Sequence, residues 1–171
     1  KGQPKSHLYT WVRRRGSFAA NLRRGLASTT TPAVLVVGVD LPFIKTTAVT
    51  QFLEEALKTG ADLCYGIVSA GKSDELYPSW PKTVCQLKEG SFTGANVVWA
   101  TREAWERLIP FCQNLHVMRK SPLRLARFFG WDIVARLVIA QVIPPALSIN
   151  QLEQRARQRT NLRVRALVCH P

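Results

Sequence analysis

Residues 33–39 form a short and almost continuous apolar run in which valine predominates. Such a run is typical of a strand in a parallel sheet that is covered on both faces, because a strand with one solvent-exposed face alternates polar and apolar residues. Asp40, Leu41 and Pro42 follow at once. Proline cannot donate to a central ladder, so the strand is expected to stop there. The pattern places Asp40 at the carboxyl end of a buried strand.

Helices and strands are expected to alternate around this run. Ser17 is a good N-cap for a helix over residues 17–28, whose apolar side chains recur every four positions. A second helix is expected over residues 47–59, ending near Gly60, and a second apolar strand over residues 61–68. This order favours βαβ units and a parallel sheet.

The later part of the chain predicts a hairpin and more helices. Residues 71–81 are polar and typical of turns, and residues 88–91 are expected to join two strands of a hairpin. The expected strands are 83–87, 92–100 and 164–169, and the expected helices are 101–111, 121–129, 132–140 and 148–159. We therefore expect a three-layer α/β domain over residues 1–171, with a mainly parallel sheet and an added hairpin.

Length and cysteine content bound the class of protein. The 171 residues fit one domain with a real core. No apolar run approaches the roughly 20 residues that span a bilayer, so no membrane association is expected. The four cysteines form no CxxC pair and have no histidine at zinc-ligand spacing, so they are expected to be structural. A reducing, cytoplasmic setting follows from that expectation.

The net charge of +13 has two readings. It is either a solvated basic surface or a surface that favours anionic ligands such as phosphates or nucleic acid. The strongest basic cluster lies on a predicted helix and the strand after it, so its members do not share one face and a solvated surface is favoured. The cluster comprises Arg155, Arg157, Arg159, Arg163 and Arg165.

Asp40 is the first candidate for chemistry. In open α/β sheets, ligands bind beyond the carboxyl ends of the strands, and a carboxylate there suits Mg²⁺ that also contacts substrate phosphates. The alternative is that Asp40 caps the next helix or only terminates the strand. The sequence shows no Ser-His-Asp or Cys-His arrangement, and its three histidines are scattered.

Three stretches resemble one enzyme family. Residues 34–43, Val-Leu-Val-Val-Gly-Val-Asp-Leu-Pro-Phe, resemble the strand and metal-binding Asp of the molybdenum-cofactor nucleotidyltransferase-like group. Residues 16–22 are similar to the helix start before that strand, and residues 92–98 to a later Gly-Asn strand that lines the acceptor side of the cleft. The resemblance implies a glycosyltransferase-A-like, Rossmann-like fold in which Asp40 is the metal ligand and the central catalytic residue.

Two features of that family are absent. Its members begin with a glycine-rich loop whose backbone amides hold nucleotide phosphates, and nothing like it occurs before Gly16. They also carry a second Asp near the end, about where this chain stops at Pro171. The domain is therefore expected to be incomplete at both ends.

The expected function is Mg²⁺-dependent transfer of a nucleotidyl group from a nucleoside triphosphate to a phosphorylated small molecule or cofactor. Gly94 and Asn96 are expected to bind the acceptor, although a strand bulge explains them nearly as well. Lys82 is expected to meet a phosphate, with a solvated loop lysine as its alternative. The rival function is a catalytically silent basic module that binds nucleic acid or another polyanion. For an enzyme, only weak, sequence-independent binding to nucleic acid is expected.

Overall fold

The computed structural model describes residues 10–39, 41, 44–76, 83–118 and 147–169. Asp40 and Lys82, two of the predicted site residues, lie outside the described residues. The helices predicted over residues 121–129 and 132–140 also lie outside them.

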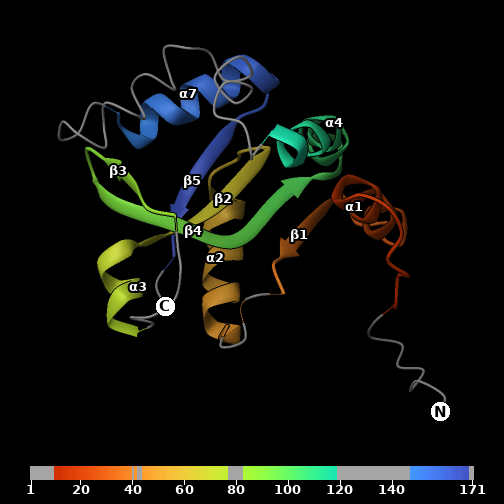
Figure 1. The fold of residues 1–171 in the computed structure, drawn as a ribbon, viewed down its shortest axis with the longest axis horizontal. Coiled ribbons are helices and arrows are strands. Elements are labelled where there is room, and N and C mark those ends of the chain that lie inside the picture. The colour runs from red at the N-terminus through yellow and green to blue at the C-terminus, as the bar shows by residue number, and fades with distance from the viewer. Residues whose placement is uncertain (1–9, 40, 42–43, 77–82, 119–146, 170–171) are drawn as a thin grey trace.

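The described strands form one five-stranded mixed sheet (Figure 1). They are β1 (Ala33–Val37), β2 (Leu63–Ser69), β3 (Cys85–Leu87), β4 (Gly90–Thr101) and β5 (Val164–Val168). The order is β1-β4-β2-β5, and β3 pairs with β4 as the predicted hairpin. Only the β2–β5 pairing is parallel; β4 is antiparallel to β1, β2 and β3. The predicted α/β class is confirmed.

The prediction of a mainly parallel sheet is not confirmed, because β4 lies between β1 and β2 and runs antiparallel to both. We expected the hairpin to be an addition to a parallel sheet. Instead its second strand is long enough to pair with both neighbours, so that Val98 lies opposite Val36 on one side and Tyr65 on the other. Residues 97–100 are apolar throughout, as suits a central strand covered on both faces. The strands β1, β2 and β5 still run in the same direction.

The described helices are α1 (Phe18–Ala27), α2 (Thr46–Lys58), α3 (Ala70–Leu76), α4 (Arg102–Met118) and α7 (Ile149–Thr160). Three of them, α1, α4 and α7, begin at the capping residues Ser17, Thr101 and Ser148. Ser17 accepts a hydrogen bond from the Ala20 amide, and Ser148 forms a capping box with Gln151. The prediction of turns over residues 71–81 is wrong for its first part, since α3 continues directly from the end of β2.

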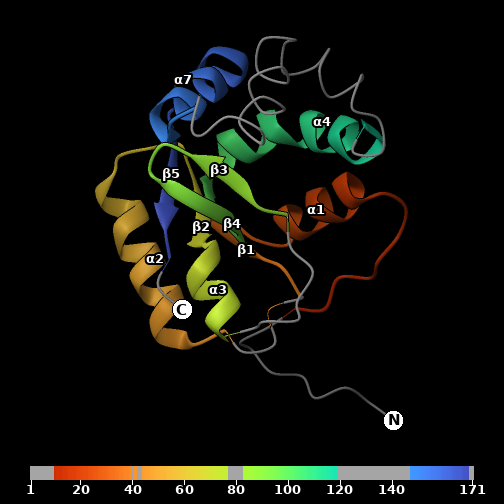
Figure 2. The ribbon, with the colours of Figure 1, turned by 60° about the vertical axis from the view of Figure 1, so that its left-hand side comes forward.

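Helices lie on both faces of the sheet (Figure 2). On one face, α1 and α4 pack Leu26 and Trp105 against Leu63 of β2. On the opposite face, α2 packs Phe52 against Trp99 of β4. A third cluster joins α7 to the far part of the sheet near the β3–β4 hairpin. The burial of these side chains supplies most of the favourable free energy of folding.

Candidate functional site

The carboxyl ends of β1, β2 and β5 face one edge of the sheet, since these strands run in the same direction (Figure 1). This is the edge at which α/β folds bind ligands. β1 ends at Val37, and the chain continues through Gly38 and the fully exposed Val39. Asp40 comes next in sequence. The described backbone therefore ends directly before the residue predicted to bind metal, and Asp40 itself lies outside the described residues.

One predicted site residue, Asn96, lies beside this strand end. The Gly38 amide donates a hydrogen bond of 2.8 Å to the Asn96 carbonyl, which extends the β1–β4 pairing one residue past Val37. The structure therefore brings Asn96 close to the backbone that leads into Asp40. Gly38 and Asn96 are 58 positions apart in the sequence, and no local pattern implied their contact.

Asn96 lies in an irregularity of β4. Tyr65 of β2 pairs with Val98, but Ile67 pairs with Gly94, so β4 holds two extra residues between these pairs. Asn96 has a φ of 52°, in the left-handed region that asparagine adopts more readily than most residues. The bulge that we considered as an alternative explanation of Gly94 and Asn96 is therefore present. Bulges are frequent next to active sites, so the two explanations are compatible.

Gly94 makes room for Tyr65. A methyl group on Gly94 would collide with the Tyr65 hydroxyl, because the tyrosine side chain lies over this point of β4. Tyr65 is 39% exposed as a residue, and its partial burial raises the pKa of the phenol. One face of the Gly94 backbone is thus occupied by a side chain that the sequence did not single out. The predicted role of Gly94 in binding an acceptor stays a prediction.

The neighbouring Gly66 allows close packing on the opposite face. A methyl group there would meet Val97 Cγ1, and it would lie 3.0 Å from Cys169 Sγ and 3.1 Å from Ala95 Cβ. Adjacent residues of β2 therefore hold the bulge from both sides, with Tyr65 over one face and Gly66 under the other. Ala95 and Val97, the residues on either side of Asn96, thus pack closely against β2.

The cysteines do not form a nucleophilic centre. All four are free. Burial raises the pKa of each thiol above its ordinary value, and for Cys169 the nearby Glu55 adds to burial and the pKa reaches about 11. A thiol with a raised pKa is protonated near neutral pH and reacts slowly. Cys64, which is fully buried, has the structural role predicted for it.

Ion pairs account for part of the C-terminal arginine cluster. Arg163 pairs with Asp62 at 2.7 Å, and Arg165 pairs with Glu153 at 3.0 Å. The Arg163 guanidinium and backbone amide both donate to Asp62, which lowers the pKa of that carboxyl below its usual range. These two arginines hold β5 to its neighbours. The other three lie exposed on α7.

Among the described residues, no helix is long and apolar enough to cross a membrane. The same residues hold no group of three or more His, Cys, Asp or Glu side chains that could bind a metal ion.

No protein-family model and no curated protein matches this chain. A solved structure described as a hypothetical transferase from Thermus thermophilus is similar to it, with a TM-score of 0.79 and 31% sequence identity. The match covers 91% of this chain, and this chain spans 64% of the length of the Thermus thermophilus protein. The α/β fold described above is therefore shared with a solved protein over nearly all of the present chain.

Proposed function

We propose that this chain is part of a transferase that moves a nucleotidyl group from a nucleoside triphosphate to a phosphorylated small molecule. The observation that supports the proposal best is the hydrogen bond between Gly38 and Asn96. It joins the bulge in β4 to the strand end that leads into Asp40, at the edge where α/β folds bind ligands. The similarity to a hypothetical transferase supports the general class.

Asp40 would hold Mg²⁺ in this proposal. A carboxylate is a hard oxygen ligand, and Mg²⁺ is commonly bound by one or two carboxylates together with water and substrate phosphates. When bound, the ion would neutralise charge on the phosphates and align them for in-line attack. A phosphate acceptor is already anionic near neutral pH, so the reaction needs no general base from the protein.

The remaining roles belong to side chains around the strand end. The Asn96 amide would orient the acceptor, in a bulge of β4 that packs closely against Tyr65 and Gly66. Lys82 would contact a phosphate. The partners are thus a nucleoside triphosphate and a phosphorylated acceptor, as the resemblance to the molybdenum-cofactor nucleotidyltransferase-like family implies.

The test is a product assay with the full natural protein, Mg²⁺, each nucleoside triphosphate and a panel of phosphorylated acceptors. Nucleotidyl transfer releases pyrophosphate, whereas phosphoryl transfer releases a nucleoside diphosphate. We expect pyrophosphate, and we expect Asp40→Asn to reduce its release at least about a hundredfold, as for removal of a charge-stabilising group.

The matched control is Glu54→Gln, which removes the same charge from an exposed position on α2. It should leave the rate unchanged within about twofold. Release of nucleoside diphosphate would replace nucleotidyl transfer with another transferase reaction. An active protein in which Asp40→Asn has no effect would remove Asp40 from the mechanism.

A further inference from the structure

The first part of the chain is basic and contains no acidic residue. Residues 1–39 include seven Lys and Arg, and the first Asp or Glu in the sequence is Asp40. Within the described residues, five exposed arginines belong to this part: Arg13, Arg14, Arg15, Arg23 and Arg24. None of the five forms an ion pair with a carboxylate of the described residues. They differ in this from Arg163 and Arg165, whose charges are partly neutralised.

Two exposed aromatic rings flank the first three of these arginines. Trp11 is 70% exposed and Phe18 is 53% exposed. Aromatic side chains beside a basic segment are the kind on which the bases of a single strand stack. We call these two rings and the five arginines the N-terminal basic strip.

The backbone of the strip is held in place where it meets α1. The Arg15 amide donates to Asn21 Oδ1 at 2.8 Å, and Arg24 Nη1 donates to the Arg15 carbonyl at 3.0 Å. Gly16 then turns the chain with a φ of 73°, and Ser17 caps the helix. The arginine side chains are therefore presented from a backbone that α1 anchors.

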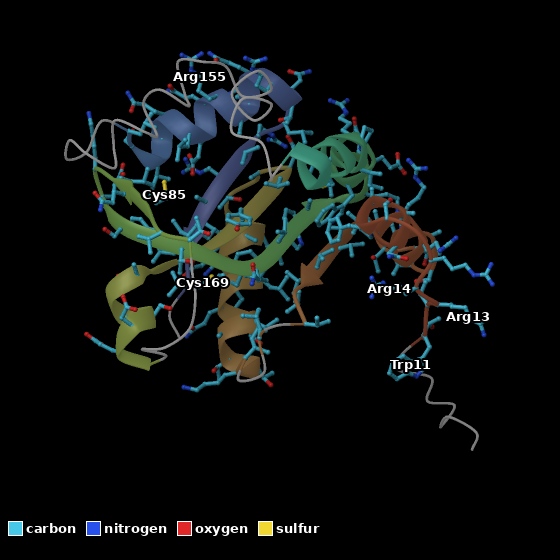
Figure 3. The ribbon with its side chains drawn as sticks, viewed as in Figure 1. Trp11, Arg13, Arg14, Cys85, Arg155 and Cys169 are labelled. Atoms are coloured by element: carbon cyan, nitrogen blue, oxygen red, sulfur yellow. The ribbon has the colours of Figure 1, made fainter. Side chains whose placement is uncertain are left out.

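The strip lies apart from the other basic surface. Figure 3 shows Trp11, Arg13 and Arg14 on the segment that precedes α1, whereas Arg155 lies on α7 at the opposite end of the molecule. The two surfaces can therefore be changed separately, and each offers arginines that can be removed in pairs.

We propose that the N-terminal basic strip binds single-stranded nucleic acid without sequence preference. Arginines that pair with no carboxylate in the described part of the chain can neutralise backbone phosphates, and exposed rings can stack on bases of any sequence. A single strand fits better than a duplex, because the faces of duplex bases are already stacked. This binding is independent of the proposed transferase reaction.

The experiment measures fluorescence anisotropy of a labelled oligo-dT of about 20 nucleotides as the full natural protein is added. For binding to a single strand, the logarithm of the affinity falls linearly with the logarithm of the salt concentration. The slope is about 0.7 per phosphate that the protein neutralises. With about four phosphates contacted, the affinity should fall about fiftyfold between roughly 50 and 200 mM salt. An affinity that does not change with salt would overturn the proposal.

Two double variants test the location. Arg13→Ala/Arg14→Ala should weaken binding at least about tenfold and reduce the salt slope by about 1.4, which corresponds to two lost phosphate contacts. Arg157→Ala/Arg159→Ala removes the same charge from exposed positions on α7 and should change the affinity by less than about twofold. Equal losses in the two variants would show that net charge, and not the strip, causes the binding.

The aromatic contribution separates nucleic acid from other polyanions. Trp11→Ala should weaken binding by about fivefold to a hundredfold, the range for one lost base-stacking contact, while Trp11→Phe should recover part of the affinity. Polyphosphate of equal charge should compete poorly. Equal competition by polyphosphate, or no effect of Trp11→Ala, would overturn the assignment to nucleic acid. Circular dichroism of each variant checks that the fold is retained.

Discussion

The amide of Gly38 donates a 2.8 Å hydrogen bond to the carbonyl of Asn96. Gly38 lies one residue beyond the end of β1, and Asn96 lies in the bulge of β4. This bond connects the two stretches in which the sequence suggested chemistry. It also makes the backbone conformation of Asn96 relevant to the proposed site, because a change in φ at residue 96 would move the carbonyl that Gly38 contacts.

Asn96→Gly and Asn96→Ala separate the backbone of this residue from its amide. Glycine adopts a positive φ without strain, whereas alanine at φ 52° should lower the free energy of unfolding by about 1 kcal/mol more than glycine does. Urea unfolding measures this difference. If the amide orients the acceptor, both variants should raise the KM for the acceptor by a similar factor. A raised KM in Asn96→Ala alone would assign the effect to the backbone.

Gly94→Ala should destabilise the protein by about 1–3 kcal/mol, as expected for overpacking, because the new methyl group meets the Tyr65 hydroxyl. Tyr65→Phe removes the colliding oxygen, so the double variant should recover part of the loss and the two changes should not be additive. The control is Gly25→Ala in α1, where no atom lies within 4 Å of the new methyl group. There we expect a gain of about 0.5–1 kcal/mol. Strict additivity of Gly94→Ala and Tyr65→Phe would contradict this packing.

Asp62→Asn should lower stability at neutral pH, and the effect should disappear in acid. The hydrogen bonds from Arg163 hold the pKa of Asp62 below its unfolded value of about 3.9. The carboxylate therefore contributes stability above that value, and the contribution is lost as pH falls through the lower folded pKa. Urea unfolding from pH 7 to pH 2 measures it. Glu103→Gln, which breaks an exposed pair with Arg107, is the control and should cost no more than about 0.5 kcal/mol at pH 7. If Asp62→Asn still had a lower free energy of unfolding than the natural protein at pH 2, the electrostatic cause would be contradicted.

Glu153 should stabilise the outer edge of β5. One carboxylate oxygen accepts from the Ala166 amide at 2.8 Å and the other from Arg165 Nη1 at 3.0 Å. Glu153→Ala leaves the amide without this partner and should cost about 1–3 kcal/mol. Glu153→Gln retains an acceptor and should cost less. Amide hydrogen exchange at Ala166 should be faster in Glu153→Ala. The exposed neighbour Gln154 provides the control, since Gln154→Ala should leave that exchange rate unchanged.

Local chemistry determined much of this fold. Ser17, Thr101 and Ser148 cap the helices that they were predicted to begin, because capping needs only a side-chain oxygen and the next few amides. The apolar runs before Asp40 and after Gly60 both became strands, as their β-branched and aromatic residues favour. The prediction that the first run is buried on both faces is wrong, because β1 lies at the edge of the described sheet and its residues are only partly buried or exposed. The neutral, buried thiol of Cys64 also follows from its apolar surroundings in the sequence.

Tertiary structure decided which strands became neighbours and where the candidate site formed. The position of β4 between β1 and β2 depends on pairing between residues more than twenty positions apart, which no local pattern encodes. The collision that excludes a side chain at Gly94 depends on Tyr65 from another strand, and the contact of Asn96 with Gly38 depends on both pairings of β4. The sequence by itself therefore indicated the residues at which chemistry is expected. Only the packing of distant segments determined that Asn96 lies beside the strand end leading into Asp40.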